Sequence, residues 1–349
     1  MLTKEFIKSI TEAPGVSGHE EEVSSLIEAV LSSYCDEVKK DSLGNLIFLK
    51  KGSKRNTKIM LAAHMDEIGL MVREIDDNGF VRFTNIGGVD QRTLLCQEVT
   101  IHGKEKIYGI IGVKPPHLTD DAERSKAIGI EDLMIDTGFK KADLENILSI
   151  GDVVTVNRRT VALKNDCMAS KALDDRAGVA VLLECLKELK QLKHDIDVYC
   201  VATVQEEVGT RGATTSAYSI NPDIGIAIDV GFGRTPELNQ HETIELTKGP
   251  AITVGPNIHP KIFDHMKTIA KEQYIDYQIE IAAGPSGTDA WPMQVTRSGV
   301  ATGILSIPLR YMHTSVETLS LSDIEKSGKL LARFIVSLND RDMEDFLCY

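Results

Sequence analysis

The stretch Ile196-Asp-Val-Tyr-Cys-Val-Ala-Thr-Val-Gln-Glu-Glu207 is an apolar run that ends in two adjacent acids, and Val208-Gly-Thr-Arg-Gly-Ala213 then breaks it. The run has the composition of a buried strand, and the break can open a helix. Because successive side chains on a strand point to opposite faces, a slight bend would let one carboxylate bind a metal while its neighbour holds a water. The pair therefore predicts a hydrolytic metal site if other segments supply further ligands.

Three more apolar runs, residues 58–63, 224–228 and 300–307, lead into residues that can bind a metal. Those residues are His64, Asp229 and, after a short connection, His313. Near-continuous apolar runs are typical of strands buried on both faces of an α/β sheet, and ligands of such sheets gather beyond the carboxyl ends of the strands. The sequence thus predicts that these side chains and the two glutamates meet at one edge of a sheet.

Asp174 is the fifth candidate ligand and stands just before a helical pattern at 179–189. An Asp at this place can cap the helix or bind a cation. Each candidate taken alone has a plainer explanation, such as a helix cap for Asp174 or a solvated turn for Glu206 and Glu207. Their coincidence at strand and helix ends within one α/β alternation favours a shared site.

The donor types indicate which metals would fit. Two histidines and three carboxylates, with no thiolate, suit Zn²⁺, Co²⁺ or Mn²⁺. Five ligands suffice for two ions if one carboxylate bridges, and ions ~3.5–4 Å apart recur in aminopeptidases and phosphatases. Glu206 is then the candidate general base, because Glu207 would be occupied by metal. Asp66, two residues after His64, is placed to accept a hydrogen bond from the imidazole.

The composition excludes several classes of protein. The chain has 349 residues, 42% of them hydrophobic, and a net charge of -13, which disfavours binding to nucleic acid or to anionic membranes. No apolar stretch reaches the ~20 residues that span a bilayer, and the N-terminus lacks the apolar centre of a signal peptide. The six cysteines form no C-x-x-C pair and predict reduced thiols in the core. We therefore expect a cytoplasmic protein.

The texture of the sequence changes between about residues 70 and 165. Short alternating segments separated by Gly and Asn are typical of a small β-barrel or sandwich. Long helical patterns alternate with apolar strands on either side. We predict an α/β catalytic domain at 1–69 and 166–349, with a β-barrel domain inserted at 70–165.

Eight short segments along the chain form a recognisable set: Ala13-Pro-Gly-Val-Ser-Gly-His-Glu20, Ala63-His-Met-Asp-Glu-Ile-Gly69, Lys114-Pro-Pro-His117, Ala172-Leu-Asp-Asp-Arg-Ala-Gly178, Gln205-Glu-Glu-Val-Gly-Thr-Arg-Gly-Ala213, Asp229-Val-Gly231, Gly287-Thr-Asp-Ala290 and Arg310-Tyr-Met-His-Thr314. With them the chain resembles the glutamyl/tetrahedral aminopeptidase family of co-catalytic metallopeptidases, whose members are often labelled FrvX-like or endoglucanase M. The resemblance covers essentially the whole chain.

The resemblance implies a zinc-exopeptidase-like mixed sheet with helices on both faces, carrying a barrel that serves substrate access and oligomerisation. It implies two ions per subunit, Zn or Co, and removal of N-terminal residues from peptides. It further implies homo-oligomers, from a dimer building block up to a tetrahedral dodecamer, and a cis peptide after Asp174. The implied residues are Asp174 as the bridge, Glu207 and His313 for one ion, His64 and Asp229 for the other, Glu206 as general base, and Asp289 and His117, the latter from a neighbouring subunit, as substrate contacts.

Other functions remain open at this point. A deacylase or carboxypeptidase can be built on the same metal core, and free-amine and N-blocked substrates would separate these activities. A glycosidase wants two carboxylates about 5–9.5 Å apart on either side of the bond, which adjacent glutamates on one strand supply poorly. One Trp and 5% aromatic residues also leave little for sugar stacking. The complete set of ligands and base disfavours a catalytically dead scaffold.

Overall fold

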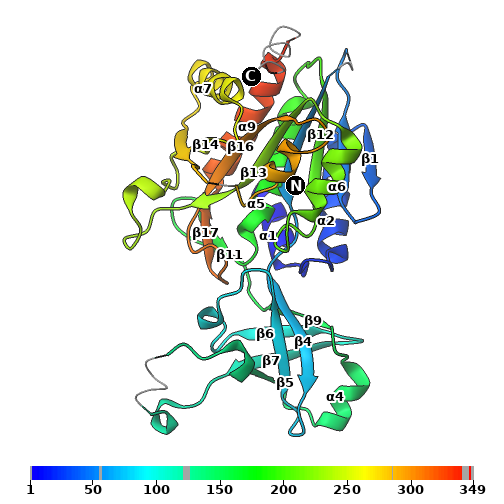
Figure 1. The fold of residues 1–349 in the computed structure, drawn as a ribbon, viewed down its shortest axis with the longest axis vertical. Coiled ribbons are helices and arrows are strands. Elements are labelled where there is room, and N and C mark those ends of the chain that lie inside the picture. The colour runs from blue at the N-terminus through cyan, green and yellow to red at the C-terminus, as the bar shows by residue number, and fades with distance from the viewer. Residues whose placement is uncertain (1, 55–56, 121–125, 285, 340–345, 347–349) are drawn as a thin grey trace.

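The computed structural model describes residues 2–54, 57–120, 126–284, 286–339 and 346. It has two lobes, a larger α/β lobe and a smaller β-barrel, which Figure 1 shows one below the other. A mixed eight-stranded sheet forms the centre of the larger lobe. In spatial order its strands are β1 (Glu37–Lys40), β2 (Leu46–Lys50), β12 (Asp197–Thr203), β3 (Lys58–His64), β13 (Ile224–Phe232), β16 (Ala301–Leu309), β14 (Ala251–Val254) and β15 (Gln278–Ile281).

The central strands β12, β3, β13 and β16 run parallel, so their carboxyl ends meet at one edge of the sheet. Alternation of side chains gives each face its own core. Along β3, Ile59, Leu61 and Ala63 pack in one hydrophobic cluster, whereas Met60 and Ala62 pack in another. The predicted mixed sheet between two helix layers is confirmed.

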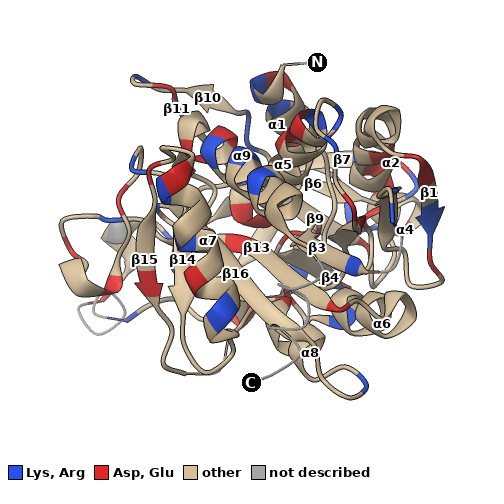
Figure 2. Cartoon of the chain, turned by 90° about the horizontal axis from the view of Figure 1, so that it is seen from above, with Lys and Arg blue, Asp and Glu red and all other residues tan. Residues whose placement is uncertain are grey.

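Helices cover both faces of the sheet. The first cluster takes side chains from α1 (Thr3–Glu12), α2 (Glu21–Leu31), α5 (Leu173–Leu189), α7 (Pro260–Glu272) and α9 (Leu321–Ser337). The second takes them from α6 (Arg211–Ile220) and α8 (Ala290–Gln294). Seen from above in Figure 2, Lys and Arg residues are interspersed with Asp and Glu along α9.

Six strands close the barrel in the order β4 (Gly69–Ile75), β5 (Val81–Ile86), β8 (Met134–Asp136), β7 (Lys106–Gly112), β6 (Glu98–His102) and β9 (Val153–Val156). A core of its own, including Leu70, Phe83, Ile101 and Ile135, fills it. The barrel elements α4 (Lys141–Ile147), η2 (Gln91–Thr93), η3 (Pro116–Leu118) and η4 (Ile130–Asp132) connect these strands. The inserted barrel expected from the texture of the sequence is therefore present.

A small sheet of β10 (Val161–Ala162), β11 (Cys167–Ser170) and β17 (Glu317–Ser320) lies where the chain returns to the larger lobe. The short helices η1 (Ser32–Tyr34) and η5 (Gln240–Glu242) complete the described elements. Strand β11 leads into α5, which carries Asp174, and β17 follows His313. Pairing of β11 with β17 thus brings together two segments that lie far apart in the sequence.

The cysteines depart in part from the prediction. The five cysteines in the described ranges are free, and Cys185 and Cys200 are buried as expected. Cys96 is exposed, so a place in the core is wrong for it, and Cys348 lies outside the described residues. Among the helices of the described segments, none is both long and apolar enough to span a bilayer.

Candidate metal centre

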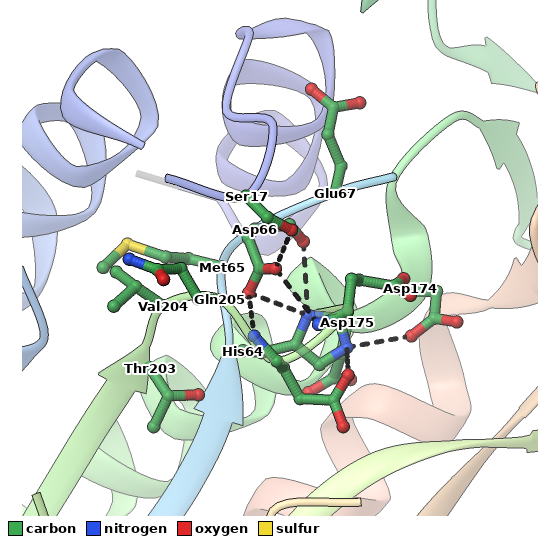
Figure 3. Close-up of polar contacts among 12 residues, drawn as sticks. Ser17, His64, Met65, Asp66, Glu67, Asp174, Asp175, Thr203, Val204 and Gln205 are labelled. Carbon is green, nitrogen blue, oxygen red and sulfur yellow. Dashed lines mark hydrogen bonds and ion pairs between the residues drawn. The ribbon is translucent and has the colours of Figure 1, made fainter. Parts of the chain in front are cut away.

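The two adjacent glutamates lie in the turn between β12 and α6, because the strand ends three residues before Glu206. Asp66 holds this turn. Its Oδ1 accepts from the backbone N–H of Glu206 at 2.9 Å, and its Oδ2 accepts from the backbone N–H of Glu207 at 3.2 Å and from the Ser17 hydroxyl at 2.6 Å. Figure 3 shows Ser17 and Asp66 side by side in this arrangement.

His64 ends β3 and is buried beside Asp66. Its Nδ1 lies 3.2 Å from the Asp66 backbone oxygen and 3.7 Å from the Asp66 carboxylate. The imidazole of His64 is thus hydrogen-bonded to the Asp66 carbonyl oxygen, while the Asp66 carboxylate accepts from the backbone N–H groups of the turn. The Nε2 atom lies 3.1 Å from Asp174 Oδ1 and 3.9 Å from Glu206 Oε2 (Figure 3 shows His64 and Asp174 facing each other).

His313 approaches Asp174 from the other side. Its Nε2 lies 3.3 Å from Asp174 Oδ2 and 3.3 Å from Glu207 Oε1. Asp174 therefore presents a different oxygen to each imidazole. The Nδ1 of His313 lies 3.1 Å from the backbone oxygen of Gly88, which belongs to the barrel, so both lobes orient this histidine.

Asp229, on β13, belongs to a second group. This group consists of one oxygen of Asp229, one oxygen of Asp175 and a ring nitrogen of His64, which all lie within 4.8 Å of one another. The first group, formed by ligand atoms of His64, Asp174 and Glu207, meets the same limit. Sequence reasoning missed Asp175, although it is the neighbour of Asp174. Its Oδ2 is buried and has no hydrogen-bond partner within the described structure. The Asp174–Asp175 peptide is cis, as the resemblance implied.

Glu317 is a second residue that the sequence did not single out. It is buried on β17, and its carboxylate accepts from the backbone N–H of His313 at 2.8 Å and of Asp174 at 3.1 Å. Its position four residues after His313 is a weak signal, because the contact with Asp174 depends on the pairing of β11 and β17. Glu317 therefore fixes the backbone beneath two candidate ligands.

A buried charge network supports the segment around Asp174. Lys171 Nζ lies 2.6 and 2.8 Å from the two Glu67 oxygens, and Arg176 Nη2 lies 3.2 Å from Glu67 Oε1. Arg176 is fully buried and also donates to the backbone oxygen of Met65 at 2.9 Å. Removing one partner would leave an unpaired buried charge, which is strongly destabilising. The network thus ties the segment after His64 to the start of α5.

The two predicted substrate contacts lie in different surroundings. Asp289 is buried, accepts from the Thr203 hydroxyl at 2.6 Å, and has its pKa raised by burial to about 6. Its Oδ1 is buried without a hydrogen-bond partner in the described part of the chain. His117 is exposed in η3 of the barrel, and none of the contacts among described residues joins it to the cluster.

The electrostatics favour added positive charge. Burial raises the pKa of Glu206 to about 10, and the nearby carboxylates, with Asp229 first among them, act in the same direction while His64 opposes them. Hydrogen bonds to Asp174 and Glu207 raise the pKa of His313 to about 11. Burial would raise the pKa of Asp174, but its bonds to the two histidines hold it below the ordinary value. So many crowded carboxylates ionise together only when cations balance them.

The residues present therefore fit divalent cations. They offer imidazole nitrogens and carboxylate oxygens without thiolate, one Asp175 oxygen lies within 4.8 Å of ligand atoms of His64 and Asp229, and the buried Asp175 Oδ2 has no hydrogen-bond partner in the described structure. A cleft lined by both lobes leads to them. It is bordered on one side by Leu70, Val89 and Leu94 of the barrel, and on the other by Asp174, Glu207, His313 and Glu317.

Comparisons with known proteins agree with this chemistry. The family model described as M42 glutamyl aminopeptidase matches residues 44–330. A lysyl aminopeptidase from Pyrococcus furiosus is 40% identical over 347 residues, which cover 98% of this chain and 99% of that protein. The solved TET aminopeptidase of Thaumarchaeota archaeon SCGC AB-539-E09 has a TM-score of 0.94 and 33% identity, with 99% of this chain and 98% of that chain covered. The TET1 peptidase of Pyrococcus horikoshii, described as assembling into a tetrahedron or a large octahedral shell, has a TM-score of 0.84 and 33% identity over 97% and 100% of the two chains.

Proposed function

The chain belongs to the M42 glutamyl aminopeptidase family, and from this premise we propose that it removes N-terminal residues from short peptides with two divalent ions and with Glu206 as general base. Membership makes it a peptide-bond hydrolase. The observation that carries the finer proposal is the convergence of two histidines and several carboxylates around Asp174. Zn²⁺ or Co²⁺, or else Mn²⁺, suits this donor set.

The proposed ligand assignment follows from the two carboxylate oxygens of Asp174, which face different histidines. This residue would bridge the ions, because its oxygens lie 3.1 Å from His64 and 3.3 Å from His313. Glu207 and His313 would complete one site, and His64 and Asp229 the other. Ions held there would polarise the scissile carbonyl and lower the pKa of a water.

The proposed role of Glu206 rests on its position. It belongs to neither group whose ligand atoms lie within 4.8 Å of one another, yet its Oε2 lies 3.9 Å from His64 Nε2. Its carboxylate would accept a proton from the attacking water and deliver it to the departing amine nitrogen. Asp66, which holds the backbone N–H groups of both glutamates, is proposed as the positioning residue of the pair.

Substrate contacts are proposed at Asp289, whose charge interacts with that of Glu206, and at His117, contributed by a neighbouring subunit. We propose that 1–69 and 166–349 form the catalytic domain and that the inserted 70–165 controls access and assembly. The contact of Gly88, in the inserted barrel, with His313 supports a role of the insert at the candidate centre.

We propose that the protein forms a homo-oligomer, from a dimer to a dodecamer of about 460 kDa at 38.4 kDa per chain, because the similar TET1 peptidase is described as assembling into a tetrahedron or a large octahedral shell. A cytoplasmic location stays a prediction.

Metal removal and substrate blocking together test the proposal. The enzyme would be assayed on leucine p-nitroanilide and on its N-acetyl form, before chelation, after it, and after return of Zn²⁺, Co²⁺ or Mn²⁺. We expect the free-amine substrate alone to be cleaved, chelation to abolish cleavage, and at least one ion to restore it. Equal release of p-nitroaniline from the N-acetyl substrate would contradict an aminopeptidase, release of acetate from it would instead favour the deacylase, and full activity after complete chelation would contradict the metal mechanism.

A further inference from the structure

Glu280 lies on the edge strand β15, but its side chain reaches back across the sheet. Its Oε2 accepts a hydrogen bond from the Thr253 hydroxyl at 2.8 Å and from the Ser306 hydroxyl at 2.5 Å. Both hydroxyl residues are almost fully buried, on β14 and β16 respectively. The carboxylate is therefore held in one orientation by groups that cannot move far.

The strand register places this carboxylate beside the candidate metal centre. Ser306 is the partner of Asp229 in the parallel pair of β16 and β13. Gly231, two residues after Asp229, faces the same side of the sheet. A Cβ on Gly231 would lie 2.9 Å from Glu280 Oε1, so glycine is what permits this close approach. Two residues of strand span about 7 Å, so Oε1 lies about that far beyond Asp229 along β13.

The other oxygen of Glu280 has no cation. Among the residues that the structure describes, Oε1 takes part in no hydrogen bond or ion pair. Arg234, in the segment that follows β13, is engaged with Glu245 at 2.8 Å, and the Arg310 Nε donates to the Arg234 backbone oxygen. Ile244 supplies an apolar surface at the same place, with its Cδ1 2.8 Å from the Cβ position of Gly231.

A fixed, partly exposed carboxylate above an apolar wall matches the chemistry of a basic side chain. Lysine and arginine have an apolar stem that packs on such a wall and a cation at its end. A separation of about 7 Å from Asp229 is comparable with the reach of a four-carbon stem. A substrate whose scissile bond lies at the metal centre would thus carry the tip of its first side chain toward Glu280.

We propose that Glu280 is a specificity-determining residue that binds the cationic side chain of an N-terminal lysine or arginine. The inference rests on the proposed aminopeptidase function and names its substrate class. Because two hydroxyls already orient the carboxylate, little conformational freedom is lost when the cation binds. An acidic N-terminal side chain would be repelled from the same position.

The test compares p-nitroanilides of lysine and norleucine, which share a four-carbon stem and differ in the ammonium group. We expect wild-type kcat/KM to be higher for lysine, and the lysine-to-norleucine ratio to fall about 10- to 100-fold in Glu280→Gln, as for loss of a hydrogen bond to a charged group. Glu272→Gln, an exposed change on α7 with the same loss of charge, should keep the wild-type ratio.

Two results would overturn the inference. One is a lysine-to-norleucine ratio that is unchanged in Glu280→Gln. The other is a wild-type enzyme that does not prefer lysine, and this result does not depend on whether the variant folds. Failure of the proposed function differs from both, because wild-type enzyme supplied with metal would then cleave neither substrate. Direct binding of L-lysinamide and L-norleucinamide by calorimetry gives a readout besides turnover, and equal affinities would also count against Glu280.

Discussion

Glu206 and Glu207 are neighbours in sequence, yet their carboxylates face different partners. The Oε2 atom of Glu206 lies 3.9 Å from His64 Nε2, and Oε1 of Glu207 lies 3.3 Å from His313 Nε2. This division depends on the turn in which they stand, whose two backbone N–H groups are held by Asp66. A single residue that ends an apolar run could not be given a role from the sequence alone. The pair could, because two adjacent acids need two environments.

The carboxyl group of Glu20 should make the stability of the protein depend on pH. Burial raises the pKa of Glu20 from 4.5 to about 7, although N–H groups of Gly18 and Gln205 oppose the shift. A carboxyl whose pKa is higher in the folded than in the unfolded state stabilises the fold below about pH 4.5. That contribution is lost as the pH rises through about 7.

Glu20→Gln should therefore flatten the dependence of the free energy of unfolding on pH between about 4.5 and 7, by an amount on the order of 2 to 3 kcal/mol. Urea unfolding at a series of pH values would measure the difference from wild type. The exposed Glu21→Gln is the matched control and should keep the wild-type slope. The same slope in Glu20→Gln as in wild type would show that Glu20 does not titrate in this range.

At the scale of elements, the sequence predicted the strands and the barrel from their hydrophobic patterns. It missed the contacts that exist only because distant strands pair. The apolar run at 58–64 coincides with β3, and the alternating segments at 70–165 gave the barrel. The apolar run predicts a strand up to Gln205, whereas β12 ends at Thr203, because the run continues past the point where the backbone leaves the sheet. Glu317 was missed, because its bond to Asp174 spans 143 positions and exists only through β11 and β17.

The loop between β5 and η2 is an element whose shape should matter for activity. A Cβ on Gly88 would lie 2.9 Å from Nδ1 and 3.0 Å from Cε1 of His313. Gly88→Ala should therefore displace the imidazole and lower kcat/KM for leucine p-nitroanilide, by up to ~100-fold for a shift of about 1 Å.

Gly112→Ala in the same barrel is the control, because nothing lies within 4 Å of its Cβ position. It should retain wild-type kinetics. If both variants behave alike, the barrel loop does not orient His313 in the working enzyme.

At the scale of the whole molecule, the candidate centre lies between two lobes with separate cores. The larger lobe supplies all the candidate ligands, whereas the barrel supplies one wall of the cleft and the carbonyl oxygen that faces His313. A barrel inserted between β3 and α5 thus borders a cleft that leads to the chemistry. The family comparison adds that chains of this kind are aminopeptidases, and one similar solved structure is described as assembling into a tetrahedron or a large octahedral shell.

The central claim is that the ions are held by one set of residues while Glu206 moves the proton. Glu206→Gln separates these functions, because the amide keeps the size of the side chain but cannot accept the proton. The decisive measurement is the metal content of purified Glu206→Gln together with its kcat on leucine p-nitroanilide. We predict wild-type metal content with kcat reduced by about 10²- to 10⁴-fold. Wild-type kcat with metal retained would contradict the account.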